Sequence, residues 1–163
     1  MSDETYQPKT YRKDGGDTIV VASGGKVDVE AGGALNMRGF AAQIQPTPNT
    51  QTAAVTLTIA NLLTGIIEAT PTTGATRAYT LPTGSDVDAG VTMVADDSFD
   101  WCLINLQATA ATDTITVTAA SSGHTIVGNA IVASANASRI DGSSAIFRTR
   151  KTAANTFVTY RIA

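Results

Sequence analysis

Residues 113–119 read DTITVTA, and this stretch indicates the fold class of the chain. Ile115 and Val117 alternate with three threonines, which is the period of two that places apolar side chains on one face of a strand. Threonine is both β-branched and polar, so it suits the solvated face of a sheet. The stretch therefore predicts a strand with one buried face and one exposed face.

Similar segments flank this strand and are separated by turn residues. Many short strands with frequent turns are typical of antiparallel sandwiches and barrels. Thr58 is expected to cap a short helix closed by Gly65, and Ser85 followed by Asp88 indicates the start of a second. The predicted fold is mainly β, an antiparallel β-sandwich or barrel (jelly-roll-like) with two short helices. The predicted strands cover residues 66–70, 77–81, 97–106, 113–119, 124–133, 144–151 and 156–162.

Three glycine pairs, beginning at residues 15, 24 and 32, predict a small β-meander over residues 15–40. Paired glycines permit the positive φ angles of tight turns, and short strand-like segments lie between them. A meander of this length cannot bury a core alone. We therefore expect closed symmetry to pool three copies in a homotrimer. The residues expected at that trimer interface are Ile19, Val21, Val27 and Val29.

Three further segments complete the predicted organisation. Residues 1–14 are polar and are expected to form a flexible N-terminal arm, either a passive terminus or one that orders on a partner. Residues 41–54 contain two prolines and no charge, so they predict a linker. Residues 55–163 are the predicted β-sandwich domain. The arm residues expected to contact a partner, because they combine aromatic rings with cations, are Tyr6, Lys9, Tyr11, Arg12 and Lys13.

The composition excludes several classes of protein. Charged residues make up only 15% of the chain, while 26 alanines and 26 threonines make up about a third. So little charge argues against a disordered chain and against a coiled coil. A single cysteine excludes a disulfide scaffold, and a net charge of −3 gives no basic footprint for nucleic acid. We expect no nucleic-acid partner.

The polar start of the chain, MSDETYQPKT, lacks the basic and apolar regions of a secretory signal. The uncharged stretch between Arg38 and Glu68 contains too much Gln, Pro, Asn and Thr to span a bilayer. We therefore expect a protein that is made in a cytoplasm and has no membrane partner.

Basic residues concentrate near the C-terminus. Residues 139–163 hold five basic residues against one acidic residue, whereas residues 17–138 hold three against ten. Two interpretations stay open. The cations belong either to a solvated strand face or an intersubunit pairing, or to a basic docking patch formed by Arg148, Arg150 and Lys151.

Residues suited to catalysis or metal binding are sparse. His124 and Cys102 are the only histidine and cysteine, and a catalytic pair is disfavoured because Cys102 lies mid-strand and His124 follows a turn-like Ser-Ser-Gly. Asp96, Asp97 and Asp100 could offer oxygens to calcium, but turn and cap roles are the simpler interpretation. We expect no enzyme activity, no cofactor and no metal. Trp101 alternates with polar residues as a core position does, which argues against a sugar-binding aromatic.

From about Val55 onward, the chain resembles a domain found in structural proteins of tailed-phage virions. The matching segments are Leu62–Ile67, Thr80–Thr83, Asp97–Phe99 with Ile104–Leu106, Gly123–Asn129, Phe147-Arg148 and Thr159–Arg161.

The resemblance implies a capsid decoration (cement) protein or head-fibre protein, often trimeric, with the major capsid protein as partner and the outer capsid surface of the virion as location. The expected function is therefore stabilisation of the head, and no functional residue is transferred from the resemblance. The alternative is a head or tail fibre adhesin that binds host glycan.

Overall fold

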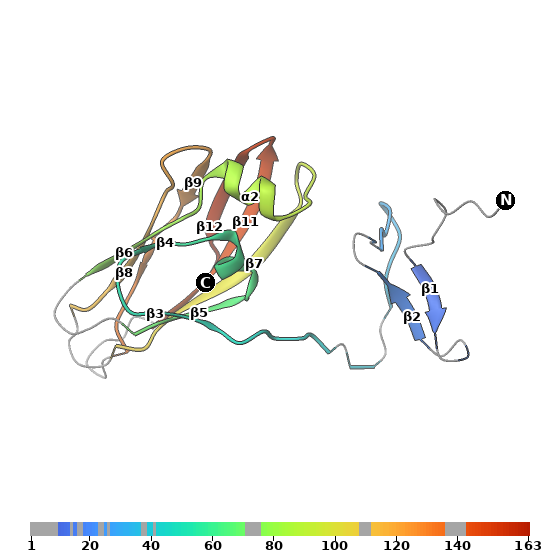
Figure 1. Ribbon diagram of the computed structural model, residues 1–163, viewed down its shortest axis with the longest axis horizontal. Coiled ribbons are helices and arrows are strands. Elements are labelled where there is room, and N and C mark those ends of the chain that lie inside the picture. Colours follow the sequence, from blue (N-terminus) through green and yellow to red (C-terminus); the bar gives the residue numbers. More distant parts are fainter. Residues whose placement is uncertain are drawn as a thin grey trace. The chain divides into compact units, whose positions relative to one another are not determined.

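The structure, a computed structural model, describes residues 10–13, 15, 18–22, 25, 27–36, 39–40, 42–70, 76–107, 112–135 and 143–163. The chain divides into two compact units, Met1–Gln43 and Ile44–Ala163, which are described separately here (Figure 1). Strands account for 41% of the structure and helices for 10%. The prediction of a mainly β protein with two short helices is therefore confirmed for the described residues.

The unit Met1–Gln43 contains a β-hairpin. Strand β1 (Thr10–Lys13) pairs antiparallel with β2 (Thr18–Val21). Gly15 lies between the two strands with a φ of 70°, which is the left-handed conformation that glycine adopts at low cost. A second turn is closed where the Gly33 N–H donates to Glu30 O at 2.8 Å. The Gly25 N–H likewise donates to Ala22 O at 2.8 Å, so a residue of each of the three glycine pairs marks a turn, as predicted.

The rest of the meander and the arm differ from the prediction. Residues 27–30 and 33–36 flank the second turn but form no strand. An alternating sequence forms a strand only where a neighbouring strand supplies hydrogen bonds, and the described residues offer these two segments no such neighbour. Conversely, residues 10–13 were expected to be part of a flexible arm but form β1, because β2 provides that ladder.

The unit Ile44–Ala163 holds two sheets and both helices. Its helices are α1 (Ile59–Leu63) and α2 (Gly84–Gly90). Its strands are β3 (Asn49–Gln51), β4 (Val55–Thr56), β5 (Ile66–Ala69), β6 (Arg77–Thr80), β7 (Ser98–Asn105), β8 (Ile115–Thr118), β9 (His124–Val127), β10 (Ile131–Val132), β11 (Ser144–Ala153) and β12 (Thr156–Arg161). The predicted strands within residues 66–162 are thus present, and the segment predicted over 124–133 is divided into β9 and β10 by Gly128, whose φ is 101°.

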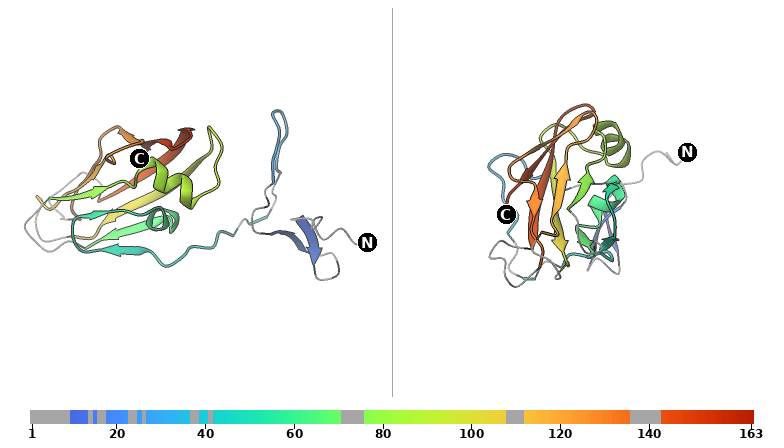
Figure 2. Two further views of the ribbon diagram at one scale, coloured as in Figure 1. Left: turned by 45° about the horizontal axis from the view of Figure 1, so that its top comes forward. Right: turned by 90° about the vertical axis from the view of Figure 1, so that its left-hand side faces the viewer.

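The strands form mixed sheets, so the prediction of a purely antiparallel arrangement is wrong. One sheet has the order β10-β8-β6-β4, and the other has the order β3-β5-β7-β11-β12-β9. From β3 to β8, consecutive strands alternate between the two sheets (Figures 1 and 2). Within each sheet, every new strand pairs in parallel with the strand that entered the sheet before it. The chain makes three successive windings before β10, β11 and β12 add antiparallel pairs. The pattern of one strand does not reveal which sheet the next strand enters.

The region 41–54 is not entirely a linker. The division between the units falls after Gln43, but residues 49–51 form β3, which pairs in parallel with β5. The Asn-Thr-Gln sequence has little strand propensity of its own. Its backbone forms a strand because it pairs with the edge of β5, and the Thr70 N–H donates to Gln51 O at 2.8 Å.

Threonine caps begin both helices. Thr58 caps α1 as predicted, and a capping box is completed by the side chain of Asn61. The second helix begins earlier than predicted, because its cap is Thr83 rather than Ser85. The Thr83 hydroxyl accepts a hydrogen bond from the Asp86 N–H at 3.2 Å. The pair Thr83 and Asp86 therefore has the spacing of a capping box.

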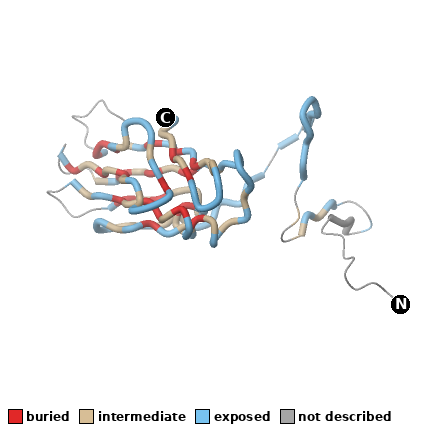
Figure 3. The backbone as a smooth tube through the Cα atoms, turned by 90° about the horizontal axis from the view of Figure 1, so that it is seen from above, coloured by how far each residue is buried: buried red, intermediate tan, exposed pale blue. Residues whose placement is uncertain are grey.

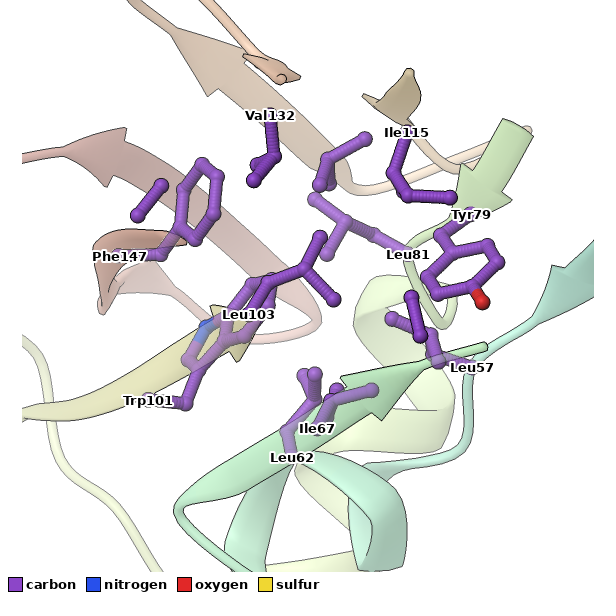
Figure 4. Packing of buried hydrophobic residues seen from close by; sticks show 13 residues of the cluster. Leu57, Leu62, Ile67, Tyr79, Leu81, Trp101, Leu103, Ile115, Val132 and Phe147 are labelled. Carbon is purple, nitrogen blue, oxygen red and sulfur yellow. The ribbon is translucent and has the colours of Figure 1, made fainter. Parts of the chain in front are cut away.

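The core of this unit draws on both sheets and on α1. Figure 3 shows buried residues recurring along the strands, and Figure 4 shows how their side chains meet. Trp101 is buried as predicted and stacks on Phe147, with ring centroids 4.6 Å apart. The cluster comprises Leu57, Leu62, Ile67, Ala69, Tyr79, Leu81, Trp101, Leu103, Ile115, Val117, Val132, Ala145 and Phe147.

Candidate functional site

The hairpin brings together residues from the two predicted contact sets. Arg12 lies opposite Ile19 in the register of β1 and β2, while Tyr11 lies opposite Val20 and Lys13 opposite Thr18. Tyr6 and Lys9 lie outside the described residues. Tyr11, Arg12 and Lys13 of the predicted arm contacts therefore belong to the same hairpin as Ile19 of the predicted trimer interface.

The residues predicted for the trimer interface are all solvent-accessible in the single chain. Ile19 is 66% exposed and Val27 is 65% exposed, with Val21 and Val29 at 40% and 45%. These side chains are therefore accessible to a partner, as the predicted interface requires. The structure brings Ile19 and Val21 onto one strand, whereas Val27 and Val29 lie on the irregular segment before Gly32.

Three of the basic residues near the C-terminus, Arg148, Arg150 and Lys151, are paired with carboxylates of the same chain. Arg148 makes a bidentate pair with Asp100, through Nε to Oδ1 and Nη2 to Oδ2, both at 2.7 Å. Arg150 pairs with Asp96. The hydrogen bond from Arg148 lowers the pKa of the Asp100 carboxyl, and the bond from Arg150 to Asp96 raises the pKa of the arginine.

Lys151 is the most enclosed of these cations. Its ammonium group donates to Asp88 of α2 and, at 2.9 Å, to Met93 O. The other Asp88 oxygen accepts from the Asn155 N–H at 2.6 Å, so one carboxylate ties α2 to the β11–β12 turn. The hydrogen bond from Lys151 and the one from the Asn155 backbone both lower the pKa of Asp88. Arg148, Arg150 and Lys151 thus contribute to a paired strand surface of their own chain.

A chain of hydrogen bonds runs through the interior beside the core. The Trp101 indole donates to Thr149 Oγ1 at 3.1 Å, and the Thr149 and Thr159 hydroxyls lie 2.8 Å apart. His124 Nε2 is 2.7 Å from Thr159 Oγ1, and its Nδ1 is 2.9 Å from Pro82 O. We call these five residues the buried polar chain.

The acceptors in the buried polar chain determine which atom is the donor in each of its hydrogen bonds. A carbonyl oxygen only accepts, so His124 carries its proton on Nδ1 and accepts at Nε2 from Thr159. Thr159 then accepts from Thr149, which accepts from Trp101. Burial lowers the pKa of His124. His124 begins β9, as the predicted strand over residues 124–133 requires, and it is only 1% exposed.

Cys102 and His124 do not form a pair. Cys102 lies on β7 between buried Trp101 and Leu103, so its side chain is on the outer face of the six-stranded sheet. His124 lies on β9, at the edge of that sheet, and both of its ring nitrogens are engaged inside. Cys102 is partly buried, and this burial raises the pKa of its thiol.

The three aspartates that were weighed as calcium ligands have structural partners. Asp96 and Asp100 pair with arginines, and Asp97 Oδ2 accepts from the Val94 N–H at 2.9 Å. Within the described ranges, no group of three or more His, Cys, Asp or Glu side chains is placed to hold a metal ion. Neither described helix has the length and apolar character needed to cross a bilayer.

The outer face of the six-stranded sheet carries a feature that the sequence analysis missed. Ile66 is in register with Cys102, and Cys102 is in register with Ile146. The Ile162 N–H donates to Ile146 O at 2.9 Å, which extends the alignment onto the last residues of the chain. These four residues form what we call the apolar row. In the segments IIEA and WCLINL, apolar residues occur at positions that point to both faces of the strand. This was the signal in the sequence for an apolar outer face.

Comparisons with protein-family models, with curated proteins and with solved structures found no match to this chain.

Proposed function

We propose that this chain is a structural protein of a tailed-phage virion, a capsid decoration (cement) protein that binds the outer surface of the head as a homotrimer. The observation that carries the proposal is the division of the chain into two units. One unit has its own core, while the other leaves Ile19 and Val27 largely exposed. Exposed side chains of this kind lose their contact with water only against a partner.

The proposed partner of the N-terminal unit is the major capsid protein, with residues 1–40 making the contact and the C-terminal unit facing outward. The pairing of Arg148 and Arg150 within the chain supports this assignment, because cations already bound to carboxylates gain little from a second acidic partner. The action is mechanical. Binding to the assembled shell but not to its dissociated subunits stabilises the shell.

We further propose that Ile44–Ala163 is a two-sheet sandwich. The core cluster supports this, since it combines Ile115 and Val117 of the four-stranded sheet with Leu103 and Phe147 of the six-stranded sheet. Inner faces that supply one common core are the defining feature of a sandwich.

The glycan-binding adhesin is the weaker alternative. Sugar sites usually present an exposed aromatic ring, but Trp101, the single tryptophan, is 1% exposed and stacks on Phe147. Its indole N–H is also engaged by Thr149. The cement function therefore agrees better with the placement of this residue.

Cosedimentation with expanded, undecorated heads of the same phage tests the proposal. We expect the full chain to saturate the heads, and deletion of residues 1–14, which removes β1, to abolish or strongly weaken binding. The double variant Arg148→Ala with Arg150→Ala is the control and should retain most of the binding, because exposed ion pairs contribute little to stability. Saturation by the truncated chain at the wild-type concentration would show that the arm is passive.

A further inference from the structure

The buried polar chain crosses four neighbouring strands of the six-stranded sheet. His124 lies on the edge strand β9, Thr159 on β12, Thr149 on β11 and Trp101 on β7, and these strands follow one another in the sheet in that order. Each of the four residues is at most 1% exposed. Their hydrogen bonds therefore form one continuous path from the edge of the sheet to the aromatic core.

With a neutral imidazole, every proton along this path has an acceptor. The Trp101 N–H donates to Thr149, the Thr149 hydroxyl to Thr159 and the Thr159 hydroxyl to His124 Nε2, over 3.1, 2.8 and 2.7 Å. His124 Nδ1–H donates to Pro82 O at 2.9 Å. Four donors are thus matched by four acceptors, and the neutral ring permits only this direction of the two hydroxyls.

Protonation of His124 adds a fifth donor, at Nε2, and removes an acceptor. The Nδ1–H bond to Pro82 O is the same in both states, so the residue before the cap of α2 stays bound to the ring. On the other side, Thr159 must accept from Nε2, and its own proton turns away from the positive ring toward Thr149. Thr149 then accepts from both Trp101 and Thr159. Its own proton is left without an acceptor, because these two residues are its hydrogen-bond partners in the described part of the chain.

Charged side chains on the elements packed against His124 take no part in this exchange. Phe157 of β12 lies beside the imidazole, with ring centroids 5.9 Å apart, and Lys151 of β11 lies 5.8 Å from the Phe157 ring centroid. Lys151 is paired with Asp88 of α2, and Asp86, the other acidic residue of that helix, is exposed. Burial lowers the pKa of His124, so the ring is neutral at about pH 7.

We propose that the buried polar chain is a pH-sensitive switch, in which protonation of His124 reverses the Thr159 and Thr149 hydroxyls and weakens the hydrogen bond of the Trp101 indole. Hydrogen bonds in a chain strengthen one another while each hydroxyl both donates and accepts, and Thr149 loses its donor role in the acid state. The acid state is a second folded arrangement, with weaker bonding between β7, β11 and β12, in which the start of α2 remains tied to β9. The inference is independent of the proposed function.

The full-length protein offers one signal for each end of the switch, because His124 and Trp101 are the only histidine and the only tryptophan. Nuclear magnetic resonance of the isotope-labelled protein follows the imidazole nitrogens and the indole N–H between about pH 7.5 and pH 4.5, the range in which histidine titrates. We expect the indole proton to shift upfield on acidification, because its hydrogen bond weakens. The shift should have the same midpoint as the imidazole titration.

Variants distinguish a relay through the hydroxyls from an effect of proximity. Thr149→Val removes the link between Thr159 and the indole, so the imidazole should still titrate while the indole signal no longer follows it. Thr149→Ser keeps the hydroxyl and should keep the shared midpoint, as should the control Thr116→Val on the outward face of β8. His124→Gln leaves both threonines in place and should abolish the indole transition.

Three results would overturn the proposal. An indole signal that stays fixed while the wild-type imidazole titrates would mean that the unmatched proton remains at Thr159. An indole transition that persists in Thr149→Val or in His124→Gln would assign the shift to other groups. Loss of the native signals before the imidazole titrates would exclude a switch, since a switch requires both states to be folded.

Discussion

In the buried polar chain, removal of a single hydrogen-bonding atom should lower the stability of the fold. Thr149 is fully buried and both accepts from Trp101 and donates to Thr159. Each buried polar atom that loses its partner costs roughly 1–3 kcal/mol. The threonines at these positions are therefore not interchangeable with valine, although valine has nearly the same shape.

The substitution Thr149→Val tests this role. It keeps the packing volume but leaves the Trp101 N–H without an acceptor, so we expect the free energy of unfolding to fall by about 1–3 kcal/mol. Thr116→Val, on the outward face of β8, is the control and should change the free energy by less than about 0.5 kcal/mol. Urea unfolding followed by tryptophan fluorescence measures both. Equal effects would mean that the hydroxyl of Thr149 contributes nothing specific.

His124 gives the fold a dependence on pH. Its folded pKa lies below the unfolded value of 6.5, so the unfolded state binds the proton more readily. The stabilisation is therefore complete above about pH 6.5 and is lost as the pH falls toward the folded pKa. Protonation of His124 would also make Nε2 a donor to the Thr159 hydroxyl. The hydrogen bond between the Thr159 and Thr149 hydroxyls would then reverse its direction.

We accordingly predict that the free energy of unfolding falls between pH 7 and pH 5 in the wild type. His124→Gln should be less stable at pH 7 and should lose most of this slope, because His124 is the only histidine in the chain. Denaturation at a series of pH values gives the comparison. An unchanged slope in the variant would assign the pH dependence to other groups.

At the scale of elements, the start of one helix and two turns meet without room for side chains. A Cβ on Gly84, at the start of α2, would collide with backbone oxygens of Asn155 and Gly123, and one on Gly123 would collide with Asn155 O. The Gly84 N–H donates to Ser122 O, and the Phe157 N–H donates to Gly123 O. Backbone packs directly on backbone here, so α2, the β8–β9 turn and the β11–β12 turn are fixed as one junction.

Gly84→Ala should therefore destabilise the protein by about 1–3 kcal/mol or more, because the obstructing atoms belong to the backbone and cannot rotate away. Ser85→Ala changes the adjacent, exposed position of the same helix and serves as the control, with an expected effect of less than about 0.5 kcal/mol. Thermal unfolding followed by circular dichroism measures both. Similar melting temperatures for wild type and Gly84→Ala would contradict the close packing of the junction.

The same elements show how far the sequence could predict the fold. The alternation in DTITVTA and the cap at Thr58 are local signals, and both β8 and α1 formed where they indicated. The parallel pairing of β3, β5 and β7 is not local, because it depends on which sheet the chain enters after each turn. β3 itself has no strand pattern and exists because β5 offers an edge.

The candidate surfaces were predictable to a similar extent. The glycine pairs indicated turns, but the pairing of Arg12 with Ile19 requires the hairpin. The partners of Arg148 and Arg150 lie 48 and 54 residues away in sequence, so the charge run alone could not distinguish a docking patch from a paired strand surface. The apolar row assembles from three strands and the segment after β12, and no single stretch of sequence contains it.

At the scale of the whole molecule, the two units divide the proposed work. The unit Ile44–Ala163 has its own core and a second, apolar sheet face, while the unit Met1–Gln43 exposes apolar side chains on a small hairpin framework. In the proposed function, the unit Met1–Gln43 contacts the capsid protein and supplies the expected trimer interface, while the unit Ile44–Ala163 faces outward. Binding through several weak contacts on one trimer gives high avidity without any single strong site.

The thermal stability of phage heads tests the central claim most directly. Expanded heads lacking the protein are heated with and without a saturating amount of the full chain, and release of packaged DNA to an intercalating dye marks the opening of the shell. A cement protein should raise the opening temperature, and the temperature should rise with the concentration of the chain until the sites are filled, as binding linkage requires. Saturable binding with no change in the opening temperature, or no binding at all, would contradict a cement function.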